Sequence, residues 1–265
     1  MKHLIIIHLF IISVFATSIQ FTQAEKNYIQ ENKNIKIGIE SAKPYIFYNS
    51  QKDTVDGLYA DFLKTILNSS GLNVEFIQDD WSTLLSNFKD KKLDILPATF
   101  YSKEREQFGL YSDSYYTVKE YIYIKASQSG DFTNLNNKKI AVVKGYATIP
   151  KLKKHFPSIE IIETKNLHES TKLVLEDKAD ALVDYHLVVE NFIYDNTIIG
   201  LKGISQNFLE EISVHYLSHI DKPLLHSIIQ KSLQNITIKE KEKIFRNWFS
   251  DMYIVNPEKT TSKIN

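Results

Sequence analysis

The chain has 265 residues, 43% hydrophobic and 24% charged, which is ordinary for a soluble globular protein with one or two cores. Its 32 basic and 32 acidic residues balance, so the composition favours neither a nucleic-acid partner nor an anionic membrane surface. It has no cysteine, which excludes disulfides and a lipid-modified cysteine and fits a bacterial periplasm better than a eukaryotic extracellular space.

The first segment has the features of a secretion signal. A basic start precedes an apolar run over 4–16, and small residues at Thr22 and Ala24 suit cleavage before Glu25. A membrane span needs about 20 apolar residues, so this run is short for an uncleaved anchor. We therefore predict a signal peptide over 1–24 and a periplasmic location.

Strand and helix patterns alternate after the signal. Apolar and polar residues alternate over 35–39, which predicts a strand. Apolar residues recur at helical spacing over 57–68, and Gly71 ends that helix. The next expected elements are a strand at 72–76, a helix at 81–88 and a strand at 93–96. This order predicts a largely parallel sheet.

The same alternation restarts after a polar stretch over 127–137, which predicts a second lobe. Its expected strands are 139–143, 159–162 and 181–183, and its expected helices are 148–156, 169–176 and 186–194. A further strand at 212–217 and two closing helices at 224–233 and 238–249 follow. Thr237 and Glu240 suit a capping box at the start of the last helix, and the polar tail over 253–265 is expected to be disordered.

Several catalytic and cofactor-binding motifs are missing from the sequence. It has no P-loop, no Gly-x-Gly-x-x-Gly, no His-Glu-x-x-His and no Gly-x-Ser-x-Gly. The 8 histidines are scattered without metal-ligand spacing. We therefore predict no cofactor, no metal and no catalytic residue.

The segment over 93–116 resembles a stretch of the family 3 bacterial extracellular solute-binding proteins. This family comprises amino-acid-binding components of ABC transporters and related Venus-flytrap sensor domains. Its members carry Thr-x-x-Arg and then Phe-Ser-x-Pro-Tyr, where this chain has Ser102, Arg105 and Tyr-Ser-Asp-Ser-Tyr over 111–115. Further matches follow in the family's order at 43–47, 56–61, 144–148, 178–181 and 236–249. The resemblance covers about residues 33–250, and the Lys-Gly-Tyr and Ile-Thr-x-x-Glu variants look closest to sensor-type members.

The resemblance implies an α/β fold of the two-lobed periplasmic-binding-protein type II, or Venus-flytrap, class. Each lobe is then a mostly parallel sheet flanked by helices. Lobe 1 would comprise 33–117 and 214–252, with 118–212 inserted as lobe 2. Two crossing segments, at 117–121 and 211–214, would form a two-strand hinge. A ligand that touches both lobes stabilises the closed state, and a monomer is expected.

Three candidate ligand-binding residues come from lobe 1. A guanidinium pairs two donors with a carboxylate, so the family context favours Arg105 as an anchor for a ligand carboxylate. The alternative is a solvated charge between Glu104 and Glu106. Tyr45 and Trp81 match family positions that form aromatic walls around a ligand, and ordinary core packing is their alternative.

The remaining matched positions come from both lobes. Phe100 and Ser102 would lie beside the ligand and offer backbone N–H groups and a hydroxyl. Tyr146 and Thr148 open a helix whose free N–H groups favour an anion, and Thr148 also suits an N-cap. Lys144 is either a second-lobe ligand contact or an exposed strand end.

Asp184 departs from the family pattern. Amino-acid binders place an Asp five residues after the Asp of the Asp-Ala pair, and here that position, counted from Asp180, is Tyr185. One residue on a strand reverses the side that a side chain faces. Either a backbone adjustment brings Asp184 to the ligand or the ammonium site is absent. A carboxylate-bearing ligand is therefore expected, and an α-amino acid stays open. Ser114 also replaces the family's Pro.

The sequence leaves three functions open. The first is capture of a small polar ligand for a membrane permease of the ABC type. The second is a periplasmic sensor module that acts through a membrane receptor. The third is a dehydratase on the same fold, which would need a catalytic acid such as Glu40 or Asp184. Since nothing in the sequence points to catalysis, a binding protein is the prediction.

Overall fold

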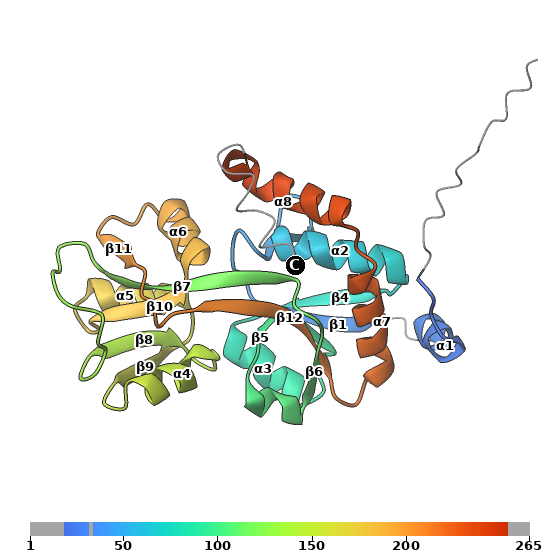
Figure 1. Cartoon of the computed structure of the whole chain (residues 1–265), viewed down its shortest axis with the longest axis horizontal. Coiled ribbons are helices and arrows are strands. Elements are labelled where there is room, and N and C mark those ends of the chain that lie inside the picture. Colours follow the sequence, from blue (N-terminus) through green and yellow to red (C-terminus); the bar gives the residue numbers. More distant parts are fainter. Residues whose placement is uncertain (1–18, 32–33, 254–265) are drawn as a thin grey trace, which may run out of the picture.

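A computed structural model of the chain describes residues 19–31 and 34–253. Figure 1 shows two lobes joined by two long strands, β7 (Tyr116–Lys125) and β12 (Glu211–His219). Residues 1–18 of the predicted signal and the predicted tail beyond 253 lie outside the described residues. Residues 19–24, which we assigned to the signal, are described, and the last two of them, Gln23 and Ala24, already belong to a helix.

The sheet of lobe 1 is built around β1 (Ile35–Ile39), which is parallel to β4 (Val74–Gln78) and β5 (Ile95–Phe100). Strand β12 joins this sheet antiparallel to β5. Shorter elements are the β2–β3 hairpin (Phe47–Asn49 and Thr54–Asp56), the 3-10 helix η1 (Lys103–Gln107) and β6 (Gly109–Tyr111). The helices are α1 (Gln23–Glu31), α2 (Leu58–Ser70), α3 (Trp81–Lys89), α7 (Pro223–Gln234) and α8 (Ile238–Tyr253).

Helix α2 shows why the apolar spacing predicted the lobe 1 core well. Leu58, Phe62 and Ile66 recur on one face of the helix and are fully buried. Gly71 follows the helix in the left-handed region, with φ at 71°, and its N–H donates to the Leu67 carbonyl. A glycine adopts this backbone without a Cβ penalty, so the helix ends where the sequence predicted.

Lobe 2 repeats the parallel arrangement. Strand β8 (Lys139–Val143) lies between β9 (Glu160–Thr164) and β10 (Ala181–Tyr185) and is parallel to both. The edge strand β11 (Leu201–Ile204) pairs antiparallel with β7. The helices of this lobe are α4 (Thr148–His155), α5 (Leu167–Leu175) and α6 (His186–Asp195).

The hinge is the antiparallel pairing of β7 with β12, from Tyr116 opposite Val214 to Lys119 opposite Glu211. Beyond this ladder β7 pairs with β10 in lobe 2, whereas β12 pairs with β5 in lobe 1. The strands therefore follow one hydrogen-bonded path, β4-β1-β5-β12-β7-β10-β8-β9. The predicted two-lobed fold with a two-strand hinge is confirmed; the residue boundaries of the lobes stay a prediction.

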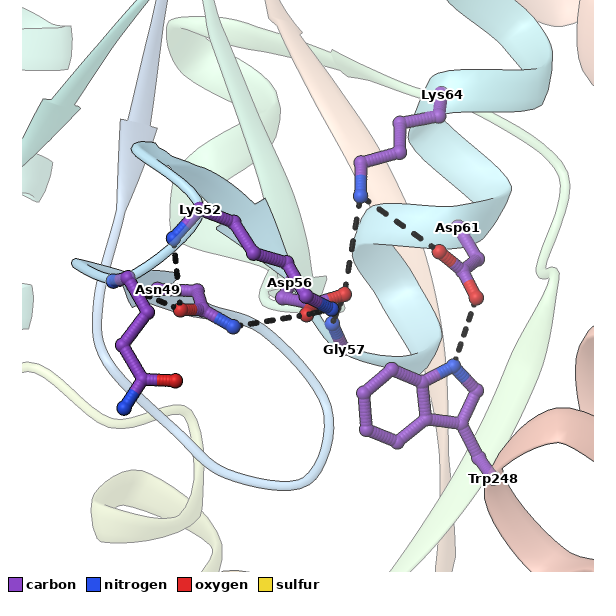
Figure 2. Close-up of polar contacts among 8 residues, drawn as sticks. Asn49, Lys52, Asp56, Gly57, Asp61, Lys64 and Trp248 are labelled. Atoms are coloured by element: carbon purple, nitrogen blue, oxygen red, sulfur yellow. Dashed lines mark hydrogen bonds and ion pairs between the residues drawn. The ribbon is translucent and has the colours of Figure 1, made fainter.

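A polar cluster attaches α8 and the β2–β3 hairpin to α2 (Figure 2). The indole Nε1 of Trp248 on α8 donates to Asp61 on α2 at 2.8 Å. Lys64 lies 3.8 Å from both Asp61 and Asp56, and Lys52 donates to Asp56 at 2.8 Å. The closing helix is therefore fixed to lobe 1 by a hydrogen bond as well as by apolar packing.

Candidate ligand-binding cleft

The two lobes enclose a cavity of about 40 Å³, which we name the core cavity and which is bordered mainly by aromatic and aliphatic side chains. Phe100 from lobe 1 stacks on Tyr185 from lobe 2 with ring centroids 4.5 Å apart. Tyr45 stacks on Tyr59 of α2 with centroids 4.7 Å apart. The aromatic side chains around the cavity are Tyr45, Tyr59, Trp81, Phe100, Tyr146 and Tyr185. A water needs roughly 10–15 Å³ on this measure, so the cavity has room for a few small groups only.

Two wider grooves flank the core cavity, and residues of both lobes border each of them. The first, of about 520 Å³, we name the Asp80 groove; its acidic residues are Glu40, Asp79, Asp80 and Asp195. The second, of about 510 Å³, we name the Arg105 groove; its basic residues are Lys89, Arg105, Lys144 and Lys153. Tyr146 borders the core cavity and both grooves, so the three spaces meet at this side chain.

Arg105 lies in η1 and bridges the two lobes. Its Nη1 donates to the Phe100 carbonyl at 2.7 Å, and its Nη2 donates across the cleft to the Gly145 carbonyl at 2.8 Å. The guanidinium also lies over the Trp81 ring, 5.1 Å from the centroid, and the residue is only 4% exposed. The solvated alternative for Arg105 is therefore wrong, while ligand binding by this residue stays a prediction.

Glu40 follows β1 and contacts lobe 2 from the lobe 1 side. Its carboxylate accepts a backbone hydrogen bond from Trp81 and a 3.4 Å hydrogen bond from the Tyr146 hydroxyl. Burial, together with the nearby charge of Asp184, raises the pKa of Glu40 to about 8. Burial in the cleft therefore favours the protonated form of this carboxyl group relative to an exposed glutamate.

Asp184 and Tyr185 lie on opposite faces of β10 relative to the core cavity. Tyr185 borders the core cavity, and Asp184 precedes it on β10, so its side chain points to the opposite face of the strand. The Asp184 carboxylate is 1% exposed and accepts the Tyr185 N–H at 2.7 Å. Burial raises its pKa to about 7. Asp184 therefore acts on the core cavity through its charge, not through contact.

Thr148 lies at the hinge side of lobe 2. Its hydroxyl donates to the carboxylate of Glu120 on β7, and both residues are buried. They border a separate cavity of about 320 Å³, together with residues of α4 and the segment before β12. Burial raises the pKa of Glu120 to about 7. The helix start that we expected to hold a ligand thus places its threonine side chain against the hinge.

The structure divides the predicted site residues into three groups. Those at the core cavity are Tyr45, Trp81, Phe100 and Tyr146. Those in the Arg105 groove are Ser102, Arg105 and Lys144, of which Lys144 is exposed. Those placed elsewhere are Thr148 and Asp184. Tyr59 and the Gly145 carbonyl were missed, although Tyr59 belongs to a matched segment.

Neither a metal-ligand cluster nor a membrane-spanning helix is found in the described part of the chain. Across residues 19–31 and 34–253, no group of three or more His, Asp or Glu residues is placed to hold a metal ion. Within the same residues, no helix is both long enough and apolar enough to cross a bilayer.

Two α/β lobes that are linked by two strands and share an interlobe cavity define a Venus-flytrap protein of the type II periplasmic-binding class. The chain belongs to the bacterial extracellular solute-binding proteins, family 3, whose model matches residues 35–251.

Relatives of the chain include sensor proteins and an extracellular binding protein. It is 24% identical to the sensor protein EvgS of Escherichia coli (strain K12) and 22% identical to the virulence sensor protein BvgS of Bordetella pertussis, over 87% and 86% of this chain. The chain spans about a fifth of those relatives, 19% of each. It is 25% identical to the arginine-binding extracellular protein ArtP of Bacillus subtilis, over 78% of this chain and 82% of ArtP.

Solved structures show the same fold. The periplasmic VFT2 domain of Bordetella pertussis BvgS superposes with a TM-score of 0.75 at 21% identity, over 86% of this chain and 99% of that one. A mutant of ArgBP from T. maritima superposes with a TM-score of 0.70 at 19% identity, over 85% of this chain and 99% of that one.

Proposed function

We propose that the chain is a periplasmic binding protein that captures a small polar, carboxylate-bearing ligand between its lobes. The observation that carries this proposal is the meeting of the core cavity and both grooves at Tyr146, with the Arg105 guanidinium beside them. A ligand that contacts both lobes in this cleft has a higher affinity for the closed form and therefore stabilises it.

The guanidinium of Arg105 would bind the carboxylate of the ligand. Its Nη2 donates to the Gly145 carbonyl, and a ligand carboxylate bound in the cleft would take the place of this acceptor. A charge-assisted bond from a guanidinium to a carboxylate is roughly twice as strong as a bond between neutral groups. The Trp81 ring beneath the guanidinium holds it in place for that exchange.

A thermal-shift screen with amino acids, organic acids and amines tests this function. A ligand at 100 times its dissociation constant should stabilise the protein by about 2.7 kcal/mol. Arg105→Ala is expected to abolish the shift given by a carboxylate ligand, whereas the control Arg246→Ala, at an exposed residue of α8, should retain it. A full shift in the Arg105→Ala protein would remove Arg105 from the ligand site.

Uptake and sensing are two uses of such a cleft, and one observation favours sensing. The protein's own side chains connect the lobes on the Asp80 side: Lys43 bonds to Asp195 at 2.8 Å, and Asp80 accepts from Lys165 at 3.0 Å and from Asn166 at 3.2 Å. An uptake protein must open to release its cargo, and these bonds oppose opening. A sensor needs only a change in lobe arrangement that a membrane receptor detects.

Deleting the gene separates these two uses once a ligand is found. Loss of uptake of that labelled ligand would establish transport through a permease. Normal uptake together with a lost transcriptional response to the ligand would establish sensing.

A further inference from the structure

Helix α1 is an integral part of lobe 1, not a loose leader. Glu25, on its first turn, is 2% exposed and accepts hydrogen bonds from Ser227 at 2.6 Å and Lys231 at 2.7 Å, both on α7. Lys231 also donates to the Gln20 carbonyl at 3.3 Å. The buried carboxylate of α1 is therefore matched to donors on a helix about two hundred residues later in the chain.

The residues that start this helix precede Glu25. The Thr22 N–H donates to the Glu25 carboxylate at 2.6 Å, and the Glu25 N–H donates to the Thr22 hydroxyl at 3.2 Å. This reciprocal pair is a capping box. Phe21, just before it, packs against the hydrophobic core. Residues 20–22 are therefore part of the structure that holds the start of α1 in place.

Cleavage before Glu25 would remove this helix start. It would delete the capping box and the first two residues of α1, Gln23 and Ala24, and leave a helix of seven residues. Isolated helices that short are unstable in water, since nucleation costs more than a few hydrogen bonds return. It would also place a new α-ammonium on the buried glutamate itself. The fold therefore argues against the predicted cleavage between Ala24 and Glu25.

We propose that a signal peptidase instead hydrolyses the peptide bond between Ser18 and Ile19. Water is consumed, a carboxylate forms on Ser18 and an ammonium forms on Ile19. Ala16 and Ser18 then supply the small residues three and one positions before the cut, directly after the apolar run. The exported chain would begin at Ile19 and would keep the whole of the helix start, including Gln20 and the Thr22–Glu25 capping box.

Export of the full precursor into the periplasm of a Gram-negative host tests this assignment. The purified protein is analysed by amino-terminal sequencing and intact mass. A first residue of Ile19 is the expected result. A protein that begins at Glu25, at any other residue, or at Met1 would overturn the proposal.

Two matched substitutions locate the cut independently. A bulky residue directly before a signal peptidase site blocks cleavage, so Ser18→Tyr is expected to accumulate uncleaved precursor. Ala24→Tyr, at an exposed position of α1, should be processed normally and still yield Ile19. The reverse pattern, in which Ala24→Tyr blocks processing and Ser18→Tyr does not, would overturn the proposal even if both proteins fold.

Discussion

The Nη2 of Arg105 in lobe 1 and the carbonyl oxygen of Gly145 in lobe 2 form a 2.8 Å hydrogen bond across the cleft. The Nε1 of Trp81, also in lobe 1, donates to the same carbonyl at 3.1 Å. Gly145 can present this carbonyl because its φ of 82° lies in a region that glycine adopts freely. Two donors of one lobe thus share one backbone acceptor of the other. The residues proposed to bind the ligand therefore also hold the two lobes together in the closed form.

Removing the guanidinium should shift the protein toward an open form. Arg105→Ala deletes a charged hydrogen bond of about 1.5–3 kcal/mol, which corresponds to a roughly 10- to 150-fold fall in the closed-to-open ratio. Small-angle X-ray scattering should show a larger radius of gyration for Arg105→Ala than for the parent protein, both without added ligand. Arg246→Ala serves as the control for loss of an exposed arginine. Superimposable scattering from all three proteins would show that this bond does not hold the lobes together.

The secondary structure was predictable where periodicity is strong and unpredictable where tertiary packing decides. The expected strand 139–143 coincides with β8, and the expected capping box forms between Thr237 and Glu240. The β2–β3 hairpin was missed because its strands have three residues each and mostly polar neighbours. Helix α1 was missed because its sequence is polar and its buried residue is a glutamate, which only the donors on α7 explain.

The candidate site was predictable only in part. The family resemblance pointed to Tyr45, Trp81, Phe100 and Tyr146, all of which border the core cavity. The interlobe acceptor for Arg105 is a backbone carbonyl. Every residue carries a backbone carbonyl, so the residue types in the sequence could not identify this one. Which of two adjacent strand residues faces the cleft depends on a register shift of one, and local patterning left this open.

Glu40 should make the protein less stable as the pH rises. Its pKa is about 8 in the folded protein and 4.5 as the ordinary value, so the folded state retains a proton that the unfolded state loses. Its contribution is fully present below pH 4.5 and is lost as the pH rises through 8. Urea denaturation across this range should show a smaller decline for Glu40→Gln than for the parent protein. The control is Glu104→Gln, at an exposed glutamate, and a Glu40→Gln curve parallel to both others would contradict the assignment.

Glu25 should show the opposite pH dependence. Burial raises its pKa, but hydrogen bonds from Lys231, Ser227 and Thr22 outweigh burial and lower the pKa to about 2 from 4.5. Its contribution is therefore present above pH 4.5 and is lost as the pH falls through 2. Lys231→Met should lower the free energy of unfolding by about 2 kcal/mol at pH 7, with a smaller effect as the pH approaches 2. An equal effect at both ends of this range would mean that Lys231 stabilises through packing alone.

The attachment of the closing helix provides the last prediction. Trp248→Phe removes the 2.8 Å indole hydrogen bond to Asp61 (Figure 2) but keeps an aromatic ring beside Phe47, whose centroid lies 6.3 Å from that of Trp248. A single hydrogen bond to a charged acceptor contributes about 1.5–3 kcal/mol, so the free energy of unfolding should fall by that amount. Asp61→Asn should cost less than Trp248→Phe, because the amide oxygen still accepts the indole N–H. Equal stability of Trp248→Phe and the parent protein would show that α8 is held by apolar packing, chiefly Phe245 against Phe62.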